Sequence, residues 1–239
     1  AAEIRAMNLA PVAPGLDRAY LVEAFDTILT QRVAAEGFEV GIRTFVEKED
    51  LYPFEETKLF SHNAGHALLG FIGHALGLTH LPQVSDHPAV LEIARAALLE
   101  EVGPALVSKF AGTGDPLFME DGYREYVDGF LERIANPYLA DTVERAVRDP
   151  SRKLGYEDRI IGPMRLALSG GIEPRHLAVS AAAAVGFWLG DRPQDFARDG
   201  LAERFRKLWG EENYSEDGDR IVSLILDARK RLECLHERA

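Results

Sequence analysis

Residues 58–77 read KLFSHNAGHALLGFIGHALG, and this stretch decides how the rest of the chain is interpreted. Its apolar residues recur at helical spacing, which predicts one helix over the whole stretch. Gly65, Gly70 and Gly73 each cost a helix about 1 kcal/mol relative to alanine, but they let neighbouring backbone approach closely. We therefore expect this helix to be buried among other elements.

One face of the predicted helix carries polar side chains. At about 100° per residue, His62 lies about 40° and His66 about 80° from Lys58. Asn63 lies about 140° from Lys58, so the four share less than half of the circumference. Burial lowers the pKa of a lysine towards neutrality, where it can exchange a proton with an alcohol or a carbonyl. An asparagine amide and an imidazole can hydrogen-bond the reacting oxygen, so the set suits alcohol–carbonyl interconversion without a metal.

Residues 145–159 form a local basic cluster in an otherwise acidic chain. Its cations are Arg145, Arg148, Arg152, Lys153 and Arg159, interrupted by Asp149, Glu157 and Asp158. Guanidinium groups pair bidentately with phosphate, which favours recognition of an anion. A solvated face with compensating acids explains the same pattern equally well.

Two sets of residues carry a resemblance to a known family. Lys58, Asn63 and His66 form the pattern Lys-x4-Asn-x2-His, and residues 136–163 read NPYLADTVERAVRDPSRKLGYEDRIIGP, with GGIEP following at 170–174. Together these motifs resemble the polyol-specific long-chain dehydrogenases of the mannitol dehydrogenase family, most of all the mannitol-1-phosphate 5-dehydrogenase branch. The similarity extends over most of the chain.

The resemblance implies roles for named residues. Lys58 would be the general acid or base, with Asn63 and His66 as the other catalytic residues. Substrate-binding candidates are Arg145 and Lys153 first, then Arg148, Arg152 and Arg159 as phosphate contacts, and His62 on the polar face. The implied substrate pair is mannitol 1-phosphate and fructose 6-phosphate. An unphosphorylated polyol or a hexuronate stays open as substrate, as does a non-catalytic helical module that binds a sugar phosphate or a protein.

The predicted fold is mostly α-helical. Residues 1–17 are punctuated by proline and glycine and are interpreted as a connector or tail, and 18–239 as the folded domain. Partial alternation predicts two short strands, Ala19–Phe25 and Gly37–Val46, as a minor β-hairpin. The resemblance implies a multi-helical fold like the C-terminal domain of 6-phosphogluconate dehydrogenase.

The family also has a nucleotide-binding Rossmann domain, which we do not find in this chain. There is no Gly-x-Gly-x-x-Gly after a strand, and 1–17 is too short for the βαβ unit of about 30 residues that this fingerprint needs. The resemblance therefore implies that NAD is bound mainly by a missing N-terminal domain, in cis or on a partner subunit. We expect this chain alone to be inactive.

Composition excludes other classes of partner. The chain has 239 residues and a formal net charge of −12, which repels nucleic acids and anionic membranes. The single cysteine, Cys234, suits a reducing cytoplasm, where we place the protein. His62 and His66 have a metal-ligand spacing, but the glutamate of His-Glu-x-x-His is missing, so no metal site is predicted.

Overall fold

The structure is a computed structural model that describes residues 27–190, 196–214 and 216–236. The chain divides into two compact units, Ala1–Tyr52 and Pro53–Ala239. The predicted connector 1–17 and the predicted strand Ala19–Phe25 lie outside the described residues.

The described part of the first unit contains two short strands, β1 (Ile28–Gln31) and β2 (Phe45–Lys48). They pair in parallel. The predicted hairpin joined Ala19–Phe25 to Gly37–Val46, and its first strand lies outside the described residues. Parallel strands need a crossover of about a dozen residues or more, which residues 32–44 supply. Of the predicted strand Gly37–Val46 only the last two residues are in β2, and Gly37, with a positive φ of 76°, lies in a turn.

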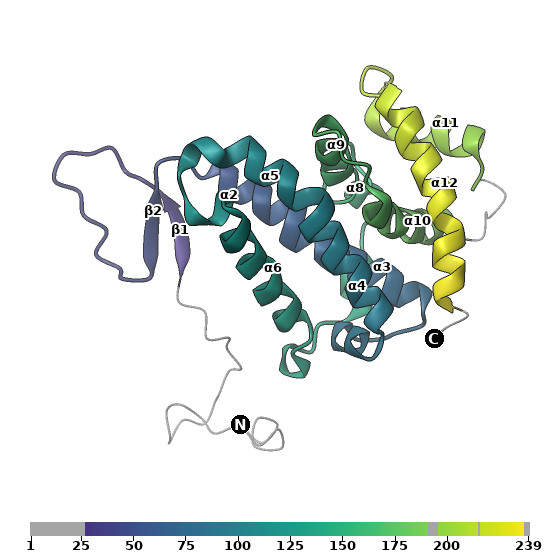
Figure 1. Cartoon of the computed structure of the whole chain (residues 1–239), viewed down its shortest axis with the longest axis horizontal. Coiled ribbons are helices and arrows are strands. Elements are labelled where there is room, and N and C mark those ends of the chain that lie inside the picture. Colours follow the sequence, from purple (N-terminus) through teal and green to yellow (C-terminus); the bar gives the residue numbers. More distant parts are fainter. Residues whose placement is uncertain (1–26, 191–195, 215, 237–239) are drawn as a thin grey trace. The chain divides into compact units, whose positions relative to one another are not determined.

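The rest of the described chain is helical, as expected (Figure 1). The α-helices are α2 (Tyr52–Thr57), α3 (Ala64–Ala75), α4 (Pro88–Ala96), α5 (Gly103–Phe110), α6 (Glu120–Ile134), α7 (Val143–Val147), α8 (Pro150–Lys153), α9 (Ile161–Ser169), α10 (Arg175–Leu189), α11 (Arg198–Trp209) and α12 (Glu216–His236). Short 3-10 helices span Leu81–Asp86, Ala111–Thr113, Pro116–Phe118 and Pro137–Leu139, and π-turns span Lys58–Asn63 and Ala97–Val102. The mostly α fold is confirmed.

The core is built where α10 packs against both α3 and α12. Ala181–Ala184 of α10 are buried, and their small side chains allow this close contact. Two glycines of α3 do what the sequence predicts. A Cβ added at Gly70 would lie 2.5 Å from Cβ of Ala146, and one at Gly65 would lie 2.5 Å from the Phe130 ring. Gly70 therefore lets α7 lie directly against α3.

A second long helix, α4 to α5, also contains a π-turn. This turn, Ala97–Val102, ends immediately before Gly103 and Pro104. A proline ring clashes with the carbonyl four residues earlier and lacks an N–H, so a wider turn at this point accommodates it. At the other end of this helix, His87 is the residue that precedes the first turn of α4.

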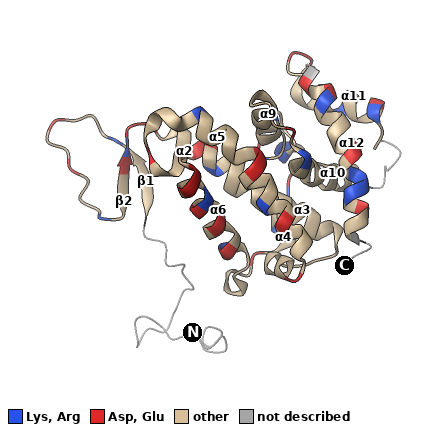
Figure 2. Cartoon of the chain, in the orientation of Figure 1, with Lys and Arg blue, Asp and Glu red and all other residues tan. Residues whose placement is uncertain are grey.

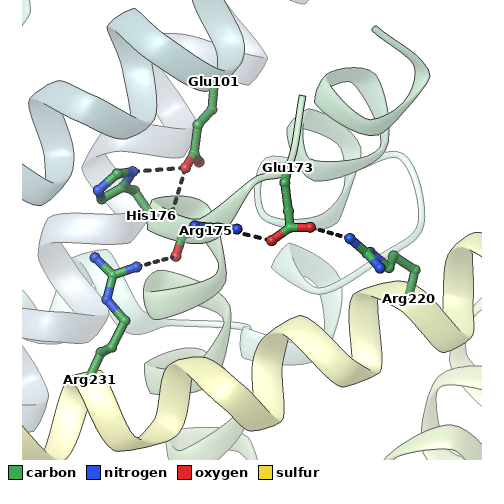
Figure 3. A network of polar contacts seen from close by, with 6 residues as sticks. All are labelled: Glu101, Glu173, Arg175, His176, Arg220 and Arg231. Atoms are coloured by element: carbon green, nitrogen blue, oxygen red, sulfur yellow. Dashed lines mark hydrogen bonds and ion pairs between the residues drawn. The ribbon is translucent and has the colours of Figure 1, made fainter. Parts of the chain in front are cut away.

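Glu101, in this second π-turn, holds the start of α10 (Figure 3). Its buried carboxylate accepts hydrogen bonds from the backbone N–H of His176 at 2.6 Å and of Leu177 at 2.9 Å. Nδ1 of His176 lies 2.8 Å from the same carboxylate. Around this contact, Glu173 pairs with Arg175 and Arg220 at the surface. Glu101 therefore satisfies helix N–H groups that would otherwise be unpaired.

Acidic side chains gather along α6 (Figure 2). They are Glu120, Asp121, Glu125, Asp128 and Glu132. This surface would repel an anionic ligand, whereas the basic residues of 145–159 lie on other elements, α7 to the start of α9. Within the described ranges, no helix combines the length and the apolar character needed to span a bilayer.

Candidate active site

Lys58, Asn63 and His66 lie on one continuous helix, formed by α2, the π-turn Lys58–Asn63 and α3. A π-turn accommodates one extra residue, so Asn63 takes the place of the fourth residue after Lys58 in an α-helix, about 40° away. His66 takes the place of the seventh, about 20° on the other side. The three side chains share a face about 60° wide, narrower than the span of about 140° expected for a regular α-helix.

The three residues differ in exposure. Lys58 is exposed, whereas Asn63 and His66 are partly buried. Neither Lys58 nor Asn63 has a side-chain hydrogen bond or ion pair within the part of the chain that the structure describes. We expected burial of Lys58, and this expectation is wrong, because its side chain is exposed in the described structure.

A buried hydrogen bond lies inside the same π-turn. Oγ of Ser61 is 2.7 Å from the hydroxyl of Tyr123 on α6, and both side chains are almost fully buried. Burial raises the pKa of Tyr123 well above its usual range, so its hydroxyl stays protonated. This contact fixes the inner side of the turn whose outer side carries Lys58 and Asn63.

We expect Ser61→Ala to destabilise the protein by about 1–3 kcal/mol, because it leaves the Tyr123 hydroxyl buried without this partner. Tyr123→Phe should have a similar effect. Removing both hydroxyls leaves no unpaired group, so the double variant should lose less than the sum of the single losses. Urea denaturation of the four proteins measures this coupling, and strictly additive losses would contradict it.

His66 is tied to the basic cluster through Asp141. Nε2 of His66 lies 2.7 Å from Oδ2 of Asp141. Oδ1 of Asp141 lies 3.0 Å from Nε of Arg145, so one carboxylate contacts both residues. Burial lowers the pKa of His66, the hydrogen bond and charge of Asp141 raise it, and the charges of Arg145 and Lys153 lower it. The structure thus places the expected catalytic histidine beside two expected substrate-binding residues.

Lys153 is the buried lysine of this region. Its side chain is 5% exposed, and Nζ donates to the carbonyls of Ala146, at 2.9 Å, and Arg148. Burial, with the charges of Arg159 and Arg152, lowers the pKa of Lys153 to about 8. The buried lysine with a lowered pKa in this region is therefore Lys153, whose contacts hold α8 to the end of α7.

The other substrate-binding candidates fall into two groups. Arg148 and Arg152 are exposed, and Arg159 is partly buried with Nε 2.8 Å from Asp158. The charges of all three act on Lys153, so the cluster read from the sequence is also a cluster in space. His62 instead turns towards α6, where it packs edge-on against Phe130 and lies 3.3 Å from Arg133.

No metal-binding arrangement is formed by these side chains. Within residues 27–190, 196–214 and 216–236, no group of three or more His, Cys, Asp or Glu residues is placed to hold a metal ion. Asp141 was not among the residues singled out from the sequence. Its place four residues before Arg145 could have indicated the pairing with that arginine, but nothing in the sequence indicates the contact with His66.

The family profile of the mannitol dehydrogenase C-terminal domain matches residues 50–228. The chain belongs to the mannitol dehydrogenase family. Over 167 residues it is 35% identical to the mannitol-1-phosphate 5-dehydrogenase of Bacillus subtilis, which covers 70% of this chain and 40% of that protein. The enzyme of the same name from Halalkalibacterium halodurans is 38% identical over 170 residues, or 71% of this chain and 44% of that protein. The chain thus spans less than half the length of these relatives.

A solved structure supports the same fold. It is the mannitol 2-dehydrogenase of Pseudomonas fluorescens in a ternary complex with NAD and D-mannitol. The superposition covers 81% of this chain and 41% of that enzyme's chain, with a TM-score of 0.64. The two sequences are 19% identical, so this likeness concerns the fold alone. These comparisons confirm two predictions from the sequence of this mannitol dehydrogenase family member. One is the family resemblance, and the other is the helical fold of the C-terminal domain.

Proposed function

We propose that this chain is the substrate-binding and catalytic domain of an NAD-dependent polyol-phosphate dehydrogenase that interconverts mannitol 1-phosphate and fructose 6-phosphate. The observation that carries the proposal is the π-turn, which collects Lys58, Asn63 and His66 on one open face of a helix. Asp141 joins this face to Arg145 of the basic cluster. The names of the relatives support the choice of substrate.

The three residues on this face suit the proton chemistry of the reaction. During oxidation the neutral amine of Lys58 takes the proton of the reacting hydroxyl, and during reduction its ammonium returns that proton to the carbonyl oxygen. The amide of Asn63 donates to this oxygen while it carries negative charge. The imidazole of His66 accepts a hydrogen bond from a neighbouring substrate hydroxyl, which fixes the position of the reacting oxygen relative to Lys58.

The dinucleotide requires groups that the described residues do not provide. Their only sheet is the parallel pair β1 and β2, and no glycine-rich turn leads from either strand into a helix. We propose that a separate nucleotide-binding domain, in cis or on a partner subunit, holds NAD, which accepts the hydride when bound. This proposal predicts no turnover of fructose 6-phosphate and NADH by the 239-residue chain alone, and robust turnover would reveal a cofactor site within it.

The basic cluster favours a phosphorylated substrate over a neutral one. The charges of Arg148, Arg152 and Arg159 converge around Lys153, and an anion would relieve their mutual repulsion. An unphosphorylated polyol is the second candidate, because the solved structure with the same fold contains D-mannitol.

The test compares mannitol 1-phosphate with mannitol in the complete enzyme, in which this chain works with a nucleotide-binding domain. A charged hydrogen bond contributes about 1.5–3 kcal/mol, so we expect KM for the phosphorylated substrate to be lower by about 10- to 100-fold. Arg152→Ala should raise that KM and leave the KM for mannitol unchanged. Equal kcat/KM values for the two substrates would favour the unphosphorylated polyol, and no oxidation of either would favour a non-catalytic module.

A further inference from the structure

The carboxylate of Asp141 lies between two residues of different kinds. One oxygen is 2.7 Å from Nε2 of His66, and the other is 3.0 Å from Nε of Arg145. A second guanidinium nitrogen of Arg145 lies 3.3 Å from the carboxylate. The side chain of Asp141 is 16% exposed and that of His66 is 20% exposed, so water screens their interaction only weakly.

We propose that Asp141 is a positioning residue, which holds the imidazole of His66 in one tautomer and the guanidinium of Arg145 in one orientation, so that both face the same substrate. The part of this inference that concerns the substrate rests on the proposed function. The part that concerns the tautomer of His66 does not, and it can be tested separately.

The chemistry of the pair fixes the tautomer. A carboxylate can only accept hydrogen bonds, so Nε2 of a neutral His66 must carry the proton that Asp141 accepts. Nδ1 is then left with its lone pair, ready to accept a hydrogen bond from a substrate hydroxyl. Without Asp141 the two tautomers would compete, and only one of them presents an acceptor on the Nδ1 side.

The backbone around Asp141 is held on both sides, so the carboxylate has a defined place. The carbonyl of Asp141 accepts a hydrogen bond from the N–H of Leu81 at 2.9 Å, and Val143 N–H donates to Thr79 at 3.0 Å. Thr142, the next residue, caps α7 by accepting from the N–H of Arg145 at 3.2 Å. The close approach of α7 to α3 at Gly70 then sets the distance between Asp141 and His66.

The charges around His66 determine what the loss of Asp141 does. Burial and the positive charges of Arg145 and Lys153 lower the pKa of His66, and Asp141 raises it by hydrogen bond and charge. Asp141 acts on His66 from the segment before α7, Arg145 from α7 and Lys153 from α8. Lys58 and His62 lie on the same helix as His66. Asp141→Asn removes the negative charge, so it should lower the pKa of His66 further.

The first experiment is an NMR titration of histidine in the 239-residue chain, wild type and Asp141→Asn. We expect the wild-type nitrogen shifts to show the Nε2–H tautomer of His66, and the variant to show a lower pKa and a mixture of tautomers. Asp128→Asn is the matched control, because Asp128 pairs with Arg95 at 2.7 Å on other helices and should leave His66 unchanged. An Nδ1–H tautomer in the wild type overturns the proposal, whether or not the variant folds.

The second experiment measures kinetics in the complete enzyme. Asp141→Asn should misplace the imidazole of His66 and the guanidinium of Arg145, so we expect kcat to fall by about 10- to 100-fold and KM to rise. Asp141→Glu keeps the carboxylate and should restore part of the loss. Unchanged kcat and KM in this variant, with kcat lost in His66→Ala, overturns the positioning role. Full activity of both His66→Ala and Arg145→Ala would instead overturn the proposed function, and the titration would still decide the tautomer.

Discussion

In the complete enzyme, Lys58→Ala is expected to lower kcat for polyol oxidation by about 10²-fold or more, as the loss of a general base usually does. The alanine variant keeps the helix, since alanine is the best helix former, but it removes the amine that takes the hydroxyl proton. Lys58 is exposed and has no ion-pair partner in the described chain, so the substitution should change stability little. Steady-state kinetics as a function of pH measure the effect.

Controls separate the loss of a base from the loss of a charge. Lys207→Ala removes an exposed lysine of α11 that pairs with Glu203, and it should leave kcat unchanged. Small primary amines added to Lys58→Ala should restore part of the rate, because they can take the same proton. A normal rate in Lys58→Ala together with a lost rate in Lys153→Met would assign the base to Lys153, whose pKa is lowered to about 8.

The proposed catalytic set follows from the spacing of residues in the sequence, but its geometry does not. In a regular α-helix the side chains of Lys58, Asn63 and His66 would spread over about 140° of the circumference. The π-turn brings them onto a narrower face. A π-turn has no simple residue signature, because it depends on tertiary contacts such as the one between Ser61 and Tyr123. The spacing itself, five residues and then three, was the available indication.

Contacts between segments far apart in the chain could not be predicted from the sequence either. Asp141 and His66 are 75 positions apart, and their contact depends on the close packing of α3 and α7 at Gly70. The parallel pairing of β1 and β2 was missed for a related reason. A hairpin is the default prediction for two nearby strands, and the second half of the connection 32–44 lies within the predicted strand Gly37–Val46.

The largest loss of stability is expected from Glu101→Ala. The buried carboxylate accepts from the N–H groups of His176 and Leu177 and also contacts the ring of His176, which is partly exposed (Figure 3). Its removal leaves these helix N–H groups without their acceptor and opens a cavity, so we expect a loss of about 2–4 kcal/mol. Glu100→Ala is the matched control, because Glu100 is the preceding residue of the same π-turn and is exposed.

The pH dependence of this loss has a definite sign. Burial raises the pKa of Glu101 above 4.5, and the hydrogen bonds from His176 and Leu177 oppose this shift without cancelling it. Above about pH 4.5 the carboxyl of Glu101 therefore keeps its proton in the folded protein more than in the unfolded chain. The contribution of this proton to the free energy of unfolding falls as pH rises from about 4.5 through the raised pKa. The deficit of Glu101→Ala relative to the wild type should be largest at or below pH 4.5 and should shrink as pH rises. Urea denaturation at several pH values measures it, and a deficit that grows with pH would mean that the helix N–H groups of α10 stabilise the ionised carboxylate more than burial destabilises it.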